Sequence, residues 1–301
     1  MQPGISTYVF FRHRLHPGLL DAMAAAGART IEIAAARHHF DYTDAPAVRE
    51  MAAWFRSNNV RAVLHQPVYL SDRADAQWSR HVEPNLNLIA NEKSHRIKAM
   101  DEVKRALECA EQVPFSDAVL HLGSKDTAWN EAVIEYSMTA IEHLKAFAGP
   151  LQMRLLLENL QNEATTPDHL LYILRIGHFD SVGVSLDVGH LHLMQPAAEP
   201  PEDSGVATAI EILGERIAQM HIHDNHGPLA HNVDRKDEHL WPGEGSIDWN
   251  AVRAAMAGLP ESVSAVIEVA GDRDESAEAI SAKASAFFEQ QERLADQVDS
   301  R

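Results

Sequence analysis

Short apolar runs alternate along the chain with longer segments in which apolar residues recur at helical spacing. Nearly continuous apolar runs are typical of strands that are covered on both faces. We therefore predict eight β-strands, at residues 4–10, 30–34, 60–65, 117–121, 153–158, 182–187, 217–221 and 265–268. The intervening and final segments predict helices at 16–26, 45–58, 97–112, 128–148, 167–176, 207–213, 248–256 and 276–294.

The alternation of strands and helices predicts the fold class. Strands that alternate with helices form parallel sheets. In a chain of 301 residues, eight such units fit a closed α/β barrel, the (β/α)8 TIM barrel. An open doubly wound sheet is less favoured because no G-x-G-x-x-G motif follows an early strand. Without a shift in composition to mark a boundary, we predict a single TIM-barrel domain over residues 1–301.

Charge and composition narrow the class of protein. The chain carries 26 Lys and Arg against 44 Asp and Glu, a formal charge of −18. This acidic excess argues against a partner held mainly through phosphate backbone or anionic lipid, so we disfavour nucleic acid as a partner and expect no membrane. The single cysteine, Cys109, excludes a disulfide scaffold and a cysteine-based zinc site. No run approaches the roughly 20 apolar residues of a membrane helix, and the start MQPGISTYVF is unlike a signal peptide, so we expect a cytoplasmic protein.

Polar side chains of metal-binding types end most of the predicted strands. Strands three to eight end at His65, His121, Glu158, Asp187, His221 and Glu268, in that order. In a barrel these ends meet at one mouth, where the active sites of this fold lie. One such residue alone is more often a hydrogen-bonding core residue, but the joint pattern favours a metal because imidazole and carboxylate suit Zn, Mn, Fe or Co. Glu32, in the second strand, fits a salt bridge or a substrate contact equally.

Two short motifs add further candidate ligands. Asp187 and His190 have D-x-x-H spacing on a predicted strand-to-loop turn, where we expect Gly189 to bend the chain. Asp237 and His239 have D-x-H spacing within a long loop that follows the seventh strand. The spacing of this second pair fits a metal site and a solvated polar loop equally.

Two predicted loops are longer than the others. They are residues 67–96, after the third strand, and residues 223–247, which begin with His223 and are rich in His, Asp and Gly. Long loops in compact domains are usually functional or mobile.

These residues together resemble the xylose isomerase-like, or endonuclease IV-like, TIM-barrel superfamily. The resemblance covers essentially the whole chain. Its motifs are GIST at 4–7, IEI at 31–33, HQP at 65–67, EN at 158–159, DVGH at 187–190, HIHD at 221–224 and PGEGSIDW at 242–249. The D-x-x-H turn and the last stretch are the most specific of these.

One branch of this superfamily contains sugar isomerases and 3-epimerases, which hold one Mn, Co or similar ion. The resemblance assigns its four ligand positions to Glu158, Asp187, His221 and Glu268. It implies that Glu158 and Glu268 act as acid and base, so that a carbon beside a polarised carbonyl loses a proton and the enediolate is reprotonated. His190 resembles the substrate-contacting histidine of this branch. The arginine that its epimerases carry just beyond the strand-seven histidine is absent, which argues against a standard ketohexose.

The endonuclease IV branch holds three zinc ions, which generate a hydroxide and clamp a phosphodiester. The chain supplies a residue for each of its nine ligands: His65, His121, Glu158, Asp187, His190, His221, Asp237, His239 and Glu268. The acidic charge and the lack of an Arg/Lys comb with aromatic wedges argue against an abasic-site nuclease. The segment 37–42 also looks like its counterpart in small-molecule members.

We therefore favour a divalent-metal-dependent isomerase or epimerase of a sugar, polyol or sugar phosphate. The ion would be Mn, Co or Zn, with more than one ion where the additional ligands bind. The residues expected to contact substrate or complete a second site are Glu32, His65, His121, His190, His223 and His239. An endonuclease IV-type zinc phosphodiesterase is the alternative, and a lyase or a non-catalytic metal or sugar binder also fits. The resemblance further implies a homodimer.

Overall fold

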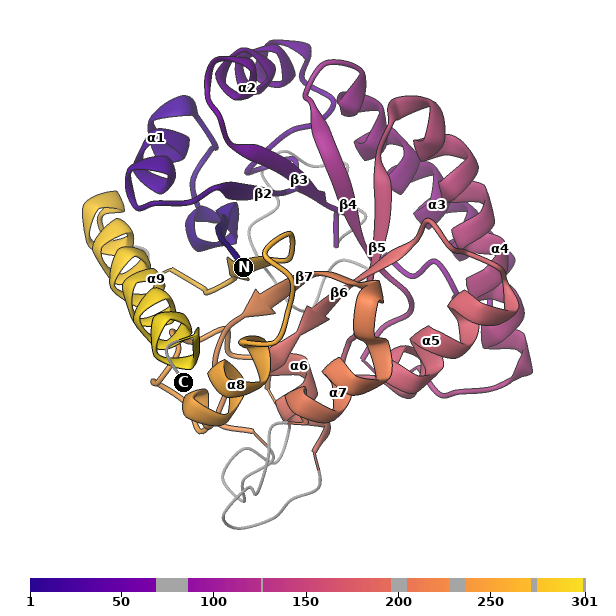
Figure 1. Ribbon diagram of the computed structural model, residues 1–301. Coiled ribbons are helices and arrows are strands. Elements are labelled where there is room, and N and C mark those ends of the chain that lie inside the picture. Colours follow the sequence, from indigo (N-terminus) through magenta and orange to yellow (C-terminus); the bar gives the residue numbers. More distant parts are fainter. Residues whose placement is uncertain (69–85, 126, 196–204, 228–235, 272–274, 300–301) are drawn as a thin grey trace.

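The computed structural model describes residues 1–68, 86–125, 127–195, 205–227, 236–271 and 275–299. Its strands close into a parallel barrel in the order of the sequence (Figure 1). They are β1 (Gln2–Ser6), β2 (Thr30–Ala34), β3 (Arg61–His65), β4 (Phe115–His121), β5 (Arg154–Glu158), β6 (Gly183–Asp187), β7 (Ile217–Ile222) and β8 (Ser264–Ile267). Because β1 also pairs with β8, the barrel has no open edge. The predicted TIM barrel is confirmed.

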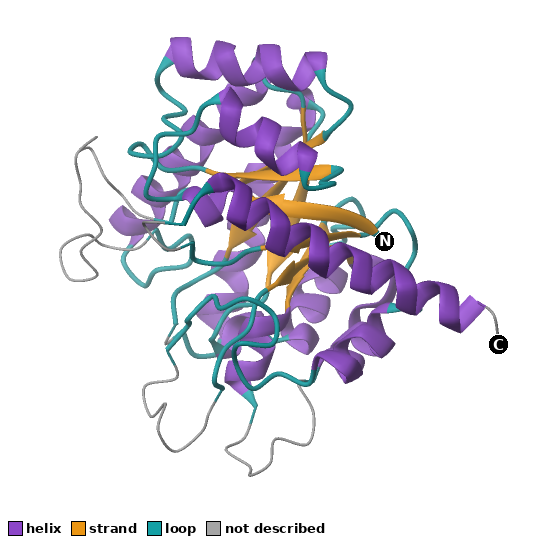
Figure 2. Ribbon diagram, turned by 90° about the vertical axis from the view of Figure 1, so that its left-hand side faces the viewer, coloured by secondary structure: helices purple, strands orange, loops and turns teal. Residues whose placement is uncertain are grey.

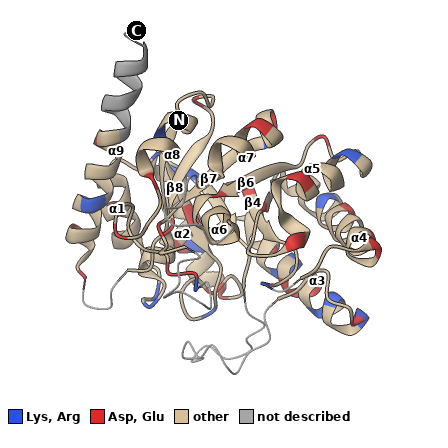
Figure 3. Cartoon of the chain, turned by 90° about the horizontal axis from the view of Figure 1, so that it is seen from below, with Lys and Arg blue, Asp and Glu red and all other residues tan. Residues whose placement is uncertain are grey.

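Helices surround the barrel on its outside (Figures 1 and 2). They are α1 (Pro17–Ala25), α2 (Ala45–Ser57), α3 (Lys93–Leu107), α4 (Glu131–Ala148), α5 (Pro167–Ile176), α6 (Val188–Met194), α7 (Val206–Leu213), α8 (Trp249–Met256) and α9 (Ala277–Asp299). Acidic and basic residues are interspersed on the outer helices, as α3, α4 and α5 show (Figure 3). Helix α9 packs along α1, where the hydroxyls of Ser281 and Ser285 donate to carbonyls of the α1 segment at 2.9 Å.

The first predicted strand, residues 4–10, is too long. Strand β1 ends at Ser6, and Thr7–Phe10 form a 3₁₀ helix. The Ser6 hydroxyl accepts a hydrogen bond from the Tyr8 N–H at 3.3 Å, and the Thr7 hydroxyl accepts one from the Ala34 N–H at 2.9 Å. These side-chain acceptors stabilise the turn, although the apolar, aromatic run by itself favours a strand.

The D-x-x-H motif starts a helix, not the strand-to-loop turn that we predicted. Asp187 is the N-cap of α6, and its carboxylate accepts a hydrogen bond from the His190 N–H at 2.6 Å. Gly189 lies within this helix and does not bend the chain. A Cβ atom at Gly189 would lie 2.0 Å from Cε1 of His223, so the glycine allows a close approach of that ring.

The two long predicted loops fall partly outside the described residues, which omit 69–85 and 228–235. Beyond the first of these gaps, α3 starts at Lys93, earlier than predicted, and a 3₁₀ turn with the buried Cys109 follows it. Within the described part of the chain, no helix combines the length and apolarity that crossing a membrane requires.

An ion cluster lies toward the amino-terminal end of the barrel, away from the candidate ligands. The Asp117 side chain is 2% exposed and accepts hydrogen bonds from Arg61 and, at 2.7 Å, from Arg154. The Ser116 hydroxyl also donates to it at 2.6 Å. The cluster joins β3, β4 and β5 at the end of the barrel where conservation and interactions usually serve stability.

Candidate metal centre

Among the described residues, ligand-type side chains converge into three adjoining groups, in each of which the potential ligand atoms lie within 4.8 Å of one another. The central group consists of Glu158, Asp187, His221 and Glu268. The inner group consists of His65, His121 and Glu158. The loop group consists of His190, His223, Asp237 and His239. The structure thus brings together all nine candidate ligands, with His223 as an additional member.

The register of the barrel brings the strand ends side by side. His121 of β4 pairs with Glu158 of β5, and Asp187 of β6 pairs with His221 of β7. Glu268 directly follows β8. Because all strands run in parallel, these side chains occupy one mouth of the barrel.

Glu158 belongs to two groups because four imidazoles surround its carboxylate. His121 Nε2 lies 3.0 Å and His65 Nε2 lies 3.4 Å from Oε2. His221 Nδ1 lies 3.5 Å from the same oxygen, and His190 Nδ1 lies 3.3 Å from Oε1. Burial by itself would raise the pKa of the Glu158 carboxyl, but positive charge on His121 and His221 holds this pKa well below its usual range.

Most of these imidazoles are oriented by a hydrogen bond at one ring nitrogen. The Nδ1 atoms of His65, His190 and His239 lie 2.9, 2.9 and 2.8 Å from the backbone carbonyl oxygens of Gln66, Asn159 and Glu268. When Nδ1 donates to its carbonyl, Nε2 faces the neighbouring carboxylates. Metal-bound histidines are held in the same way, by a hydrogen bond at the nitrogen that does not bind the metal.

The contacts of the His221 ring are the strongest evidence for a cation site. Its Nε2 lies 2.9 Å from the Glu32 carboxylate, to which it donates. Its Nδ1 is buried and has no hydrogen-bond partner among the described residues. This atom lies 3.3, 3.5 and 3.6 Å from oxygens of Glu268, Glu158 and Asp187. A buried imidazole nitrogen that faces three carboxylates fits the donor set of a divalent cation.

The carboxylates of these groups raise the pKa values of the neighbouring histidines. Burial by itself lowers the pKa of an imidazole, but the carboxylates nearby outweigh burial here. They raise the pKa of His65 and of His239 to about 9. They also raise the pKa of His190 and of His221 well above the usual range. A divalent ion would replace these protons, so its binding would release them.

Glu32 and His223, which were also expected to contact substrate, are both buried in the site. Glu32 is fully buried, and its carboxylate accepts from His221 Nε2 at 2.9 Å and from Gln219 Nε2 at 2.5 Å. His223 is fully buried as well, and its Nε2 lies 3.0 Å from both oxygens of Asp187. The sequence carried a signal for this placement: residues two apart at a strand end share a face, so the H-x-H of 221–223 directs both imidazoles inward.

The stretch 241–249 holds the loop after β7 in place. The fully buried Asp224 carboxylate accepts hydrogen bonds from Trp249 Nε1 at 2.8 Å and from the N–H groups of Gly243 and Ile247 at 2.8 and 3.2 Å. A Cβ atom at Gly245 would lie 2.3 Å from Asp224 Oδ1. This stretch, one of the two most specific motifs of the chain, therefore surrounds one carboxylate and supports the loop that carries Asp237.

A closed parallel barrel with histidines and carboxylates at one mouth is the arrangement that the family resemblance implied. A profile of the xylose isomerase-like TIM barrel family matches residues 20–291, and the chain belongs to this family.

Two curated relatives resemble the chain over part of their length. The uncharacterized protein y4fM of Sinorhizobium fredii is 27% identical over 183 residues, which are 58% of this chain and 54% of the relative. A probable endonuclease 4 of Haloquadratum walsbyi is 25% identical over 186 residues, which are 59% of this chain and 64% of the relative. The matches thus span less than two thirds of either relative.

Two solved structures match nearly the whole chain. A D-tagatose 3-epimerase-like protein has a TM-score of 0.71 at 20% identity, over 99% of both chains. The IolI protein with a bound zinc atom has a TM-score of 0.73 at 18% identity, over 97% of this chain and 98% of that one. At these identities the likeness shows the shared fold.

Proposed function

We propose that the chain is a divalent-metal-dependent isomerase or epimerase of a small carbohydrate, with the central group as its active site. The observation that carries the proposal is the His221 Nδ1 atom, which faces three carboxylates without a hydrogen-bond partner among the described residues. The fold that the chain shares with an epimerase-like protein and with a zinc-containing protein supports the same class of reaction.

The central group would hold the ion through its three carboxylates and His221 Nδ1. An ion bound there would polarise a sugar carbonyl and a neighbouring hydroxyl, which makes the intervening C–H more acidic. Glu268, 6% exposed, would accept the proton from that carbon at a carboxylate oxygen. Glu158 would return a proton to the neighbouring carbon or to the opposite face. His121, whose side chain is 16% exposed, would orient a substrate hydroxyl.

Solvent deuterium provides the test, because a reaction through a carbon acid exchanges the transferred proton. The protein, purified without chelator, is incubated in D2O with a panel of ketoses and inososes, and deuterium at carbon is followed by NMR. We expect exchange with the parent protein. Glu268→Gln should reduce the exchange rate by about 100-fold to 10,000-fold with the fold retained. The control Glu244→Gln changes an exposed glutamate of the stretch 241–249 and should exchange like the parent. Parent-like exchange in Glu268→Gln would refute the assignment.

A second candidate function is hydrolysis of a phosphodiester with several zinc ions. The observation that favours it is the sharing of Glu158 between the inner and central groups, with the loop group adjoining them. The similarity to a probable endonuclease 4 supports the same alternative. Cleavage of an abasic-site duplex or another phosphodiester, together with no deuterium exchange on any sugar, would replace the first proposal with this one.

We also propose that the protein is cytoplasmic and that it forms the homodimer that the family resemblance implies. Light scattering on the purified protein measures the molar mass directly. One chain has a mass of 33.3 kDa, and we expect a molar mass of twice this value.

A further inference from the structure

Asn159 directly follows the candidate ligand Glu158, and the proposed mechanism leaves it without a role. Its side chain is buried at the mouth of the barrel, with the residue 2% exposed. Both polar atoms of its carboxamide bind the backbone of Asp187. Nδ2 donates to the Asp187 carbonyl at 2.9 Å, and Oδ1 accepts from the Asp187 N–H at 2.7 Å. The side chain thus joins the end of β5 to the end of β6.

These two hydrogen bonds continue the contact between β5 and β6 beyond their backbone pairing. The last paired residues are Glu158 and Ser185, and Asp187 lies two residues further along β6. A carboxamide offers one donor and one acceptor, as a peptide group does. The fully buried N–H and carbonyl of Asp187 both need such partners. The Asn159 side chain therefore fixes the position of Asp187 relative to Glu158.

Holding the backbone of Asp187 also sets the direction of its carboxylate, because Asp187 is the N-cap of α6. Oδ1 accepts from the His190 N–H at 2.6 Å, and His223 Nε2 lies 3.0 Å from both oxygens. Oδ2 lies 3.6 Å from His221 Nδ1, the atom that faces the carboxylates of the central group. With its backbone and Oδ1 held, Asp187 directs Oδ2 toward the central group.

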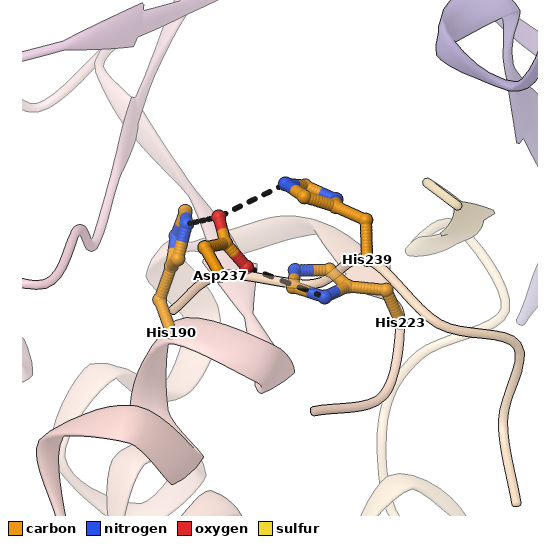
Figure 4. A group of neighbouring side chains, drawn as sticks. All are labelled: His190, His223, Asp237 and His239. Atoms are coloured by element: carbon orange, nitrogen blue, oxygen red, sulfur yellow. Dashed lines mark hydrogen bonds and ion pairs between the residues drawn. The ribbon is translucent and has the colours of Figure 1, made fainter. Parts of the chain in front are cut away.

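The backbone of Asn159 orients a further candidate ligand. Its carbonyl oxygen lies 2.9 Å from His190 Nδ1, which donates to it. His190 Nε2 is then directed to Asp237 Oδ2 at 3.0 Å, and the two side chains point toward each other (Figure 4). One buried residue therefore holds Asp187 and His190 and is covalently joined to Glu158.

We infer that Asn159 is a positioning residue, whose carboxamide holds Asp187 in the orientation that binds the divalent ion of the central group. The inference rests on the proposed function only in placing an ion at this group. Partners that orient a metal ligand contribute to metal affinity without contacting the metal. The carboxamide of Asn159 is such a partner, and it acts through the backbone of Asp187.

Asn162 provides a matched control in the same loop. It is also buried, with the residue 3% exposed. Its Oδ1 accepts from the N–H and the hydroxyl of Thr165 at 2.8 and 2.9 Å. Its Nδ2 donates to the carbonyl oxygens of Leu122 and Ser124 at 3.4 and 3.1 Å. None of these partners is a candidate ligand, so replacing Asn162 removes buried hydrogen bonds of the same kind without releasing Asp187.

The test measures metal binding and does not depend on turnover. Asn159→Ala, Asn159→Asp and Asn162→Ala are compared with the parent, with Co²⁺ as the probe. Chelator competition gives the affinity of each ion held per chain, and the visible absorption of bound Co²⁺ reports the geometry of its ligands. Thermal unfolding with and without Co²⁺ gives the melting temperatures.

We expect Asn159→Ala to lower the affinity for one ion by about 10-fold to 100-fold and to change the Co²⁺ spectrum. Asn162→Ala should keep the affinity and the spectrum of the parent. Both variants should melt at lower temperature without Co²⁺, because each leaves buried polar groups without a partner. Asn159→Asp should also lose affinity although it adds a negative charge, because the Asp187 carbonyl loses its donor. This variant keeps the size of the side chain and serves as the test where Asn159→Ala does not fold.

Two outcomes would overturn the inference and leave the proposed function standing. The first is an affinity and a Co²⁺ spectrum like those of the parent in the Asn159 variants. The second is an equal loss of affinity in Asn162→Ala, which would reduce the role of Asn159 to general stability. If no sugar exchanges deuterium but the Asn159 variants still bind Co²⁺ more weakly than the parent, the proposed function fails and this inference stands.

Discussion

At the scale of single residues, the site depends on how each imidazole is turned. His221 can present Nδ1 to the central carboxylates because Glu32, far away in the sequence, accepts a hydrogen bond from Nε2 at 2.9 Å. Gln219 donates to the same Glu32 oxygen at 2.5 Å. We therefore propose that Glu32 is a positioning residue that acts through His221.

Replacing Glu32 by glutamine should weaken metal binding with little change in fold. The amide keeps the size of the side chain but removes the charge that makes His221 a more basic ligand. We expect about a 10-fold to 100-fold loss of affinity at the central group, measured by chelator competition. The control Glu215→Gln alters an exposed glutamate in the 3₁₀ turn that precedes β7, and it should leave the affinity unchanged. Unchanged affinity in Glu32→Gln would contradict this role.

At the scale of elements, the loop after β7 is held by buried polar contacts. Asp224 collects N–H donors from the stretch 241–249, and Gly245 passes so close that any side chain would displace the carboxylate. Although this loop is long, these contacts fix the conformation of its residues around Asp224. Glycine at this position is required by contact, because Gly245 does not adopt a positive φ.

Gly245→Ala should destabilise the protein and Gly258→Ala should not. A Cβ at Gly245 meets Asp224 Oδ1 at 2.3 Å and the Asn225 carbonyl oxygen at 2.5 Å, whereas a Cβ at Gly258 meets nothing within 4 Å. We expect Gly245→Ala to lower the free energy of unfolding by about 1–3 kcal/mol. Gly258→Ala should stay within about 0.5 kcal/mol of the parent. Urea unfolding measures both values, and equal stability of the two variants would contradict the close contact.

At the scale of the whole molecule, the two ends of the barrel carry different groups of charged side chains. The mouth holds histidines and carboxylates whose potential ligand atoms face one another. At the opposite end, the Asp117 cluster joins residues of three strands. Burial by itself would raise the pKa of Asp117, but Arg61, Ser116 and Arg154 lower it below its usual value of 3.8.

The Asp117 cluster should stabilise the fold above pH 4 and lose this effect in acid. A carboxyl whose pKa is lower in the folded state stabilises the protein above its unfolded pKa, and the contribution disappears as the pH falls through the folded pKa. Asp117→Asn should therefore lower the free energy of unfolding by about 1–3 kcal/mol at pH 7. The difference from the parent should shrink as the pH is lowered below about 4.

Urea unfolding at pH 7 and in acid measures this difference. Asp180→Asn is the matched control, because Asp180 pairs with Arg216 at 3.1 Å but its side chain is 88% exposed. Such a surface pair is worth about 0–1 kcal/mol. A difference between Asp117→Asn and the parent that does not change with pH would contradict the assignment.

The sequence by itself determined the barrel and most of the candidate site. Continuous apolar runs between amphipathic segments define the order of strands and helices, and parallel strands necessarily bring their carboxyl ends to one mouth. For this reason, reading the last residue of each strand identified the residues of the central and inner groups.

Only the tertiary structure decided how these residues pair. Whether the run 7–10 stays extended depends on acceptors in Ser6 and Thr7, one of which is used by Ala34 of β2. The close approach of the His223 ring to α6 depends on Gly189, a residue of another element. Local sequence fixes the conformation that a segment prefers. The partner of each imidazole nitrogen is set by the packing of segments far apart in the chain, whose contacts leave no periodic pattern in the sequence.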